Sequence, residues 1–138
     1  MTTGNDERIE RGRATAAKLF PPERAGATGA VRLRAPSEID RDWRRFTTAT
    51  VMGDVWSRPG LDIKIRSMIV LAALTALHRP NELRLHLRGA LNLGIAREEI
   101  CEIIMQMAIY GGFPVAVEGM RIAAEVFDEV DADEGGGA

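Results

Sequence analysis

The sequence predicts an all-α protein of about six helices, built as one domain over residues 1–138 with disordered tails at 1–4 and 131–138. Three observations predict this class. Apolar residues recur at spacings of three and four, the period of an amphipathic helix. No stretch alternates apolar and polar residues as a half-buried strand does. Prolines and glycines fall between the periodic stretches, where they end helices.

The first predicted helix covers residues 5–19 and ends at two consecutive prolines. Residues 23–34, rich in Gly and Ala, are expected to form a long connection. Ser37 is the predicted N-cap of the second helix, which runs to about Met52 because a glycine and a turn follow. The aromatic residues of this region are predicted to pack inside the fold: Trp43, Phe46 and Trp56.

Four further helices follow in the second half of the chain. Residues 62–77 form the third and are so apolar that this helix is expected to be central. Pro80 suits the first turn of the fourth, which Gly94 ends, and the short loop makes the third and fourth helices antiparallel neighbours. Residues 96–110 form the fifth, and residues 114–130 form the sixth after a pair of glycines.

Composition limits the classes of function. The chain is 46% hydrophobic and 28% charged, but only 5% aromatic, with a net charge of −2 and no basic cluster. Nucleic-acid binding is therefore not expected. The longest apolar run, 68–77, is too short to cross a bilayer, and the N-terminus lacks the apolar core of a secretion signal. With Cys101 as the single cysteine, a reducing cytoplasm fits best, and we expect a cytoplasmic protein that binds no membrane.

Glu82 and His86 lie four residues apart in the fourth predicted helix. Residues at this spacing share a helix face, so the two side chains can touch. The apolar stripe of the helix places His86 at or beside its core-facing side. A neighbouring carboxylate favours the protonated imidazole, which makes His86 a candidate proton donor. The alternative is a structural ion pair at the core edge, and the spacing leaves both open.

Arginines near this pair are candidates for binding anions. Arg66 begins an apolar stripe on the third helix, so its charge needs an acidic partner, for example Glu82, or an anionic ligand. Arg58 precedes a proline in an extended turn, from which its side chain either reaches over a pocket or stays in solvent. Arg84 and Arg88 are predicted to pair with Asp or Glu.

The remaining reactive residues point to no cofactor. Cys101 lies among Ile and Met residues, so a buried, inert thiol is favoured over a nucleophile. His78 and His86 lack the further ligands that a metal site requires. Phosphate loops and dinucleotide fingerprints are absent from the sequence. Any enzyme activity is therefore expected to be free of cofactors.

Several separated segments resemble the 4-carboxymuconolactone decarboxylase family, in the same order, from about residue 5 to 127. They are MGDVWSRPGL, IRSMIVLAALTAL, ELRLHLRGALNLG, REEICEIIMQMAIYGGFPVA and EGMRIAAEVF. The wider superfamily contains alkyl hydroperoxidase D proteins, which use a CxxC followed by a histidine. Here Glu82 stands where the second cysteine would be and His86 where the histidine would be, so the resemblance to that branch implies the fold only.

The resemblance implies an alkyl hydroperoxidase D-like helical fold that assembles into a ring, as a trimer or hexamer. It implies a cofactor-independent decarboxylase that acts on a carboxylated butenolide such as 4-carboxymuconolactone and gives the enol-lactone and carbon dioxide. His86 would be the proton donor or oxyanion partner, fixed by Glu82, while Arg58 and Arg66 would bind substrate carboxylates. The implied walls of the pocket are Val51, Met52 and Leu61.

Three alternatives stay open. The first is a tailoring enzyme of the same fold that acts on another lactone or on an oxo acid. The second is an oligomer without catalysis that binds a small acid. The third is a thiol peroxidase that uses Cys101, which the missing resolving cysteine disfavours.

Overall fold

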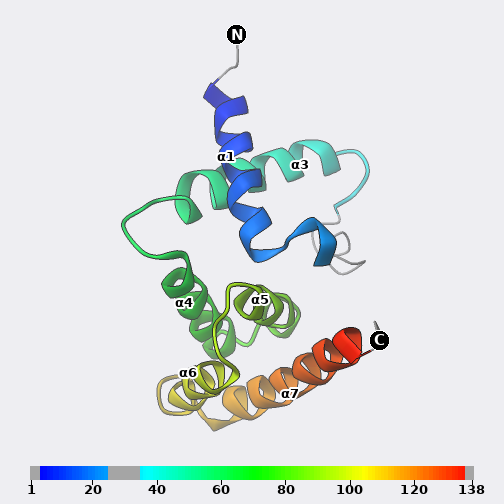
Figure 1. The fold of residues 1–138 in the computed structure, drawn as a ribbon. Helices are drawn as coiled ribbons and strands as arrows, with labels where there is room; N and C mark the ends of the chain where they lie inside the picture. The colour runs from blue at the N-terminus through cyan, green and yellow to red at the C-terminus, as the bar shows by residue number, and fades with distance from the viewer. Residues whose placement is uncertain (1–3, 25–34, 136–138) are drawn as a thin grey trace. The chain divides into compact units, whose positions relative to one another are not determined.

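A computed structural model describes residues 4–24 and 35–135. The chain divides into two compact units, residues 1–66 and 67–138. The described residues form six α-helices, a 3₁₀ turn, η1 (Pro22–Arg24), and a π-helical segment, without a strand (Figure 1). This confirms the predicted all-α class. The single domain stays a prediction, and most of the predicted connection lies outside the described residues.

The first unit is built on the crossing of α1 (Gly4–Leu19) and the π-helical segment η2 (Thr48–Trp56), visible in Figure 1. Two glycines let the backbones approach. A Cβ at Gly12 would lie 2.3 Å from the Thr48 carbonyl oxygen, and one at Gly53 would lie 2.3 Å from the carbonyl oxygen of Arg8. The buried apolar residues of these two elements are Ile9, Leu19, Ala49 and Trp56.

The second predicted helix begins and ends elsewhere than expected. Helix α3 (Asp40–Thr47) follows Ile39, which has no capping side chain, and Ser37 instead donates its hydroxyl to the Glu38 carboxylate at 3.1 Å. The predicted Ser37 cap is therefore wrong. Trp43 and Phe46, predicted to be packed inside, are 44% and 59% exposed.

The predicted end at Met52 is also wrong, because the helix continues without a break as η2 to Trp56. The Ser57 amide donates to the Met52 carbonyl at 3.1 Å, the i→i−5 bond of a π-helix. Gly53 reads as a stop signal in the sequence, yet it lies inside the helix, where α1 requires a residue without a side chain.

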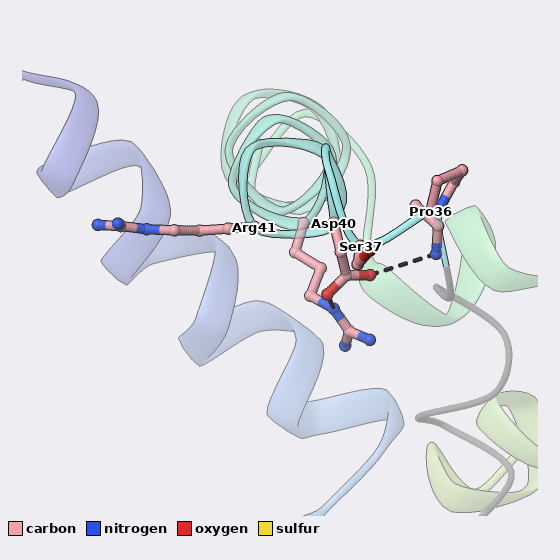
Figure 2. A pocket seen from close by; sticks show the side chains of 6 residues that line it. Pro36, Ser37, Asp40 and Arg41 are labelled. Atoms are coloured by element: carbon pink, nitrogen blue, oxygen red, sulfur yellow. Dashed lines mark hydrogen bonds and ion pairs between the residues drawn. The ribbon is translucent and has the colours of Figure 1, made fainter.

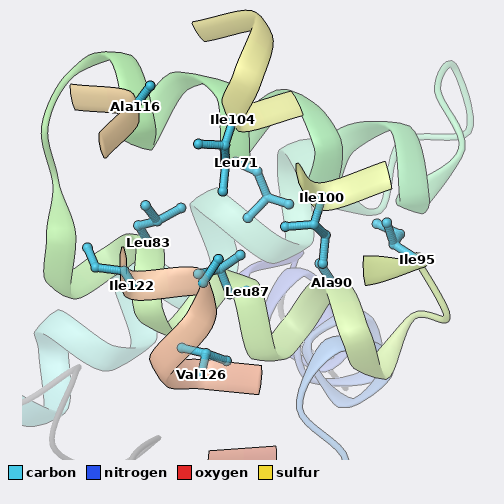
Figure 3. Packing of buried hydrophobic residues seen from close by; sticks show 11 residues of the cluster. Leu71, Leu83, Leu87, Ala90, Ile95, Ile100, Ile104, Ala116, Ile122 and Val126 are labelled. Carbon is cyan, nitrogen blue, oxygen red and sulfur yellow. The ribbon is translucent and has the colours of Figure 1, made fainter. Parts of the chain in front are cut away.

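The remaining helices agree closely with the prediction, except at the end of the last one. They are α4 (Ile63–Ala76), α5 (Pro80–Asn92), α6 (Arg97–Tyr110) and α7 (Phe113–Gly135). Residues 67–76 of α4 and the other three helices enclose the core of the second unit (Figure 3). That core comprises Leu71, Leu83, Leu87, Ala90, Ile95, Ile100, Ile104, Ala116, Ile122, Ala123 and Val126. Removing these side chains from water is the main stabilising contribution to the unit.

Helix α7 continues to Gly135, so part of the tail predicted to be disordered is helical. Partners remote in sequence explain the difference. Asp131 accepts hydrogen bonds from Arg97, the shorter at 2.6 Å, and Asp133 accepts one from Arg88 at 3.3 Å. These contacts hold the last turns against α6 and α5. None of the helices within the described ranges combines the length and the apolar content needed to cross a membrane.

Candidate active site

Helix α5 carries both residues of the predicted acid/base pair. Glu82 lies in its first turn and is exposed, whereas His86, one turn later, is only 7% exposed. Leu83 and Leu87, on either side of this turn, belong to the core cluster of the second unit. The helix therefore presents an imidazole at the border of an apolar interior, with a carboxylate one turn away toward solvent. Such an imidazole has a fixed position and little contact with water, which suits proton transfer.

The first unit holds the two predicted anion-binding arginines. Arg66, near the start of α4, donates from Nη2 to the carbonyl oxygen of Arg58 at 3.1 Å. Its Nε is buried and finds no acceptor among the described residues. The side chain of Arg58 is exposed. The structure thus brings these two residues together through a backbone oxygen, a contact that the sequence does not predict.

The three predicted wall residues also belong to the first unit. Val51 and Met52 lie in η2, and Leu61 lies in the turn before α4. Val51 and Leu61 are exposed and Met52 is half-buried. Five predicted site residues are therefore described in one unit and two in the other, and their meeting in one site is a prediction from the sequence.

Arg84 and Arg88 are engaged in ion pairs, as predicted. Arg84 bonds Glu125 and, at 3.0 Å, Glu129; Arg88 bonds Glu129 at 3.0 Å and Asp133 at 3.3 Å. We call these five side chains the α5–α7 ion-pair row. The hydrogen bond from Arg84, together with the nearby charge of Arg121, holds the pKa of Glu125 below its usual range. These guanidinium groups are already paired with carboxylates of α7.

An open hollow of ≈ 780 Å³ lies elsewhere in the first unit (Figure 2). Its lining residues are Ala35, Pro36, Ser37, Asp40, Arg41 and Arg44, none of which is a predicted site residue. Arg44 donates to the Asp40 carboxylate at 2.7 Å, which lowers the pKa of Asp40. Arg41 points away from Asp40 (Figure 2). The charged side chains that line the hollow do not point to a common place where a ligand would bind.

The thiol of Cys101 is half-buried on α6. Across residues 4–24 and 35–135, no group of three or more His, Cys, Asp or Glu side chains is placed to hold a metal ion. The predicted site residues offer proton transfer, by the imidazole of His86 and the carboxylate of Glu82, and binding of anions by the guanidinium groups of Arg58 and Arg66.

Comparisons with known proteins show that the sequence of this chain is similar to those of decarboxylases. The model of the carboxymuconolactone decarboxylase family matches residues 41–125, a range that includes every predicted site residue. The 4-carboxymuconolactone decarboxylase of Acinetobacter baylyi is 38% identical over 94 residues, which cover 68% of this chain and 70% of that protein. The nitrosuccinic acid decarboxylase npaB of Metarhizium robertsii is 37% identical over 103 residues, 74% of this chain and 72% of that protein.

Proposed function

Because this chain belongs to the carboxymuconolactone decarboxylase family, we propose that it removes carbon dioxide from a carboxylated butenolide, with 4-carboxymuconolactone as the first candidate. The chain is a carbon–carbon lyase, since two relatives named as decarboxylases align with more than two thirds of it. The observation that carries the choice of substrate is the 38% identity to a 4-carboxymuconolactone decarboxylase.

The chemistry of such a substrate explains what the protein must supply. When the bond between the ring carbon and the carboxylate breaks, carbon dioxide leaves and the electron pair passes through the ring alkene to the lactone carbonyl oxygen. An oxyanion forms, and a proton then adds to the α-carbon. The lactone accepts the electrons, so the protein has to bind the carboxylates, stabilise the oxyanion and donate one proton.

We assign these tasks to the predicted site residues. His86 is the proposed proton donor or oxyanion partner, and Glu82 orients it and favours its charged form. Arg66 and Arg58 are proposed to bind the carboxylates, because a planar guanidinium matches a carboxylate with two parallel hydrogen bonds. The departing carboxylate loses water beside apolar side chains, which favours neutral carbon dioxide. Those side chains are Val51, Met52 and Leu61.

A nitro-substituted dicarboxylic acid is the second candidate substrate. The observation that favours it is the 37% identity to a nitrosuccinic acid decarboxylase over 74% of this chain. In nitrosuccinic acid the nitro group takes the place of the lactone as electron acceptor. Both candidates therefore combine a departing carboxylate, a second carboxylate and an electron acceptor, and both present the same demands to His86 and the two arginines.

Carbon dioxide release and the change in ultraviolet absorbance with each candidate substrate test the proposal. His86→Ala should lower kcat by at least about 100-fold, the usual contribution of a positioned acid, while helical circular dichroism is retained. His78→Ala is the matched control, because His78 is the other histidine and is exposed. Full turnover by His86→Ala would contradict the proton-transfer role. Failure of the wild type to release carbon dioxide from either compound would contradict the proposed substrates.

Self-association in the cytoplasm completes the proposal. Large apolar side chains at the end of α6 and the start of α7 are exposed, and apolar groups of this size are typical of protein interfaces. They are Met105, Ile109, Tyr110, Phe113 and Val117, between 57% and 79% exposed. We propose that a second copy of the chain covers them in a trimer or hexamer.

A further inference from the structure

The loop between η2 and α4 fixes the backbone of Arg58 on both sides. The Arg58 amide donates to the Val55 carbonyl at 3.1 Å, which ties it to the end of η2. The Arg58 carbonyl oxygen accepts the bond from Arg66 Nη2, also at 3.1 Å. One peptide segment thus connects the end of one helix with a guanidinium on the next.

Neighbouring residues restrict both partners of this bond. Pro59 follows Arg58, and a proline confines the residue before it to extended backbone, which limits where the Arg58 carbonyl points. Asp62 caps α4 by accepting the Lys64 amide at 2.8 Å, and its carbonyl accepts the Arg66 amide at 3.1 Å. Acceptor and donor therefore both start from constrained backbone.

A second donor of the same guanidinium, the Nε–H group, is left without a partner among the described residues. Arg66 Nε is buried without an acceptor among the described residues. A buried charged donor without an acceptor is unfavourable, and a carboxylate oxygen would satisfy it. Because Nη2 is already held, the direction of the Nε–H bond is set before a ligand arrives, which lowers the entropy lost on binding.

We propose that the Arg58 carbonyl and Pro59 orient Arg66 so that its Nε–H donates to one carboxylate of a small dicarboxylic acid. Pro59 is then a positioning residue of the carboxylate site, although its own ring makes no contact with the ligand. The inference rests on the proposed function in one respect, namely that Arg66 binds a carboxylate.

Titration of the arginine Nε–H signals by two-dimensional ¹H–¹⁵N NMR, with succinate as the probe, tests this inference without turnover. The signal absent from Arg66→Lys identifies Arg66. In the wild type it should shift downfield and saturate with succinate, and neither dimethyl succinate nor sodium chloride of equal ionic strength should reproduce the shift. Arg66→Lys should bind succinate roughly tenfold more weakly, because lysine lacks the planar fork.

Pro59 is tested by substitutions that free the backbone in steps. Pro59→Ala should weaken succinate binding about two- to five-fold, the effect of losing a proline restraint, and Pro59→Gly should weaken it further. Pro36→Ala is the matched control, because Pro36 is an exposed proline of the same unit outside the proposed site. Circular dichroism checks that all variants fold, and the graded order of the two variants separates positioning from general loss of structure.

Two results would overturn the inference: an Arg66 signal that sodium chloride moves as much as succinate does, or equal succinate affinity in wild type, Pro59→Ala and Pro59→Gly. Both results are distinct from failure of the proposed function. Succinate binding without carbon dioxide release from either candidate substrate would retain the carboxylate site and contradict the decarboxylation. Carbon dioxide release with an unmoved Arg66 signal would do the reverse.

Discussion

Gly12 shows how a single residue determines the packing of the first unit. The place of its missing side chain is occupied by the backbone of η2, since a Cβ there would lie 2.3 Å from the Thr48 carbonyl oxygen. A contact with backbone cannot be relieved by rotating a side chain. Helix α1 and η2 would therefore have to move apart to admit even a methyl group.

Gly12→Ala should lower the free energy of unfolding by about 1–3 kcal/mol, the range for overpacking a close contact. Urea denaturation followed by circular dichroism measures the change. Gly4→Ala is the matched control, because Gly4 begins the same helix and has nothing within 4 Å of a Cβ built there. Equal stability of the two variants would show that the crossing tolerates a side chain.

At the residue scale, the sequence predicts side chains on helices better than backbone contacts. The period of 3.6 residues is enough to place Glu82 and His86 one turn apart. The sequence cannot single out the Arg58 carbonyl as a hydrogen-bond acceptor, because every residue has a carbonyl. Only the neighbouring Pro59 indicates that the direction of this carbonyl is restricted. Ser37 carries a capping signal, but the local turn offers it the Glu38 carboxylate instead.

At the element scale, the α5–α7 ion-pair row joins two helices far apart in sequence. Glu125 accepts hydrogen bonds from Arg84 of α5 and from Arg121 of its own helix, and these contacts lower its pKa. Each partner is partly exposed, so a single pair adds little to stability. The contribution of the row to stability is best measured through its dependence on pH.

The sign of that dependence follows from the lowered pKa of Glu125. Near its ordinary pKa of about 4 the unfolded chain binds more protons at this group than the folded chain does. The stabilisation is therefore fully present above that pH and is lost as the pH falls through the lowered folded-state pKa. The melting temperature of Glu125→Gln should lie below that of the wild type at pH 7, and the difference should shrink as the pH falls below about 4.5 and through the lowered pKa of Glu125.

Glu102→Gln is the matched control for this experiment, because Glu102 is exposed on α6 and no described residue forms an ion pair with it. Its difference from the wild type should not change with pH. If the difference for Glu125→Gln were equally constant from pH 7 to pH 3, the ion pairs of Glu125 would contribute nothing to stability.

The two elements whose ends were predicted wrongly depend on contacts remote in sequence. Helix α7 extends past its predicted end because Asp131 and Asp133 meet Arg97 and Arg88. The helix before Arg58 continues through Gly53 because α1 packs against it there. Rules that predict a helix end from a nearby glycine or charge consider only neighbouring residues, so they cannot take account of these remote partners.

At the scale of the whole molecule, the class of fold follows from hydrophobic period alone, since six periodic stretches without strand-like alternation leave only a helical protein. Meeting of the two sets of site residues depends on how residues 1–66 and 67–138 associate, and on neighbouring chains if the protein self-associates. A linear pattern holds no information of that kind. The feature that best indicates association with another chain is the group of exposed apolar residues at the junction of α6 and α7.

Ile109→Glu tests the proposed self-association, because Ile109 is 74% exposed in the single chain and a carboxylate buried at an interface is strongly unfavourable. The variant should elute as a smaller species by size-exclusion chromatography with light scattering, with its helical content retained. Ala132→Glu adds the same charge at an exposed position near the end of α7 and should keep the wild-type mass. A monomeric wild type, or an unchanged mass for Ile109→Glu, would contradict the proposal.

The π-helical segment affects the direction in which the chain leaves the helix. A π-turn accommodates one more residue than an α-turn, so the same residues wound with α-helical pairing would place the residue after the turn about 100° further around the helix axis. Arg58 and the peptide bond that leads into Pro59 would leave the helix in another direction. The π-helical pairing of this segment, as much as the identity of its residues, therefore sets the direction in which the following loop departs.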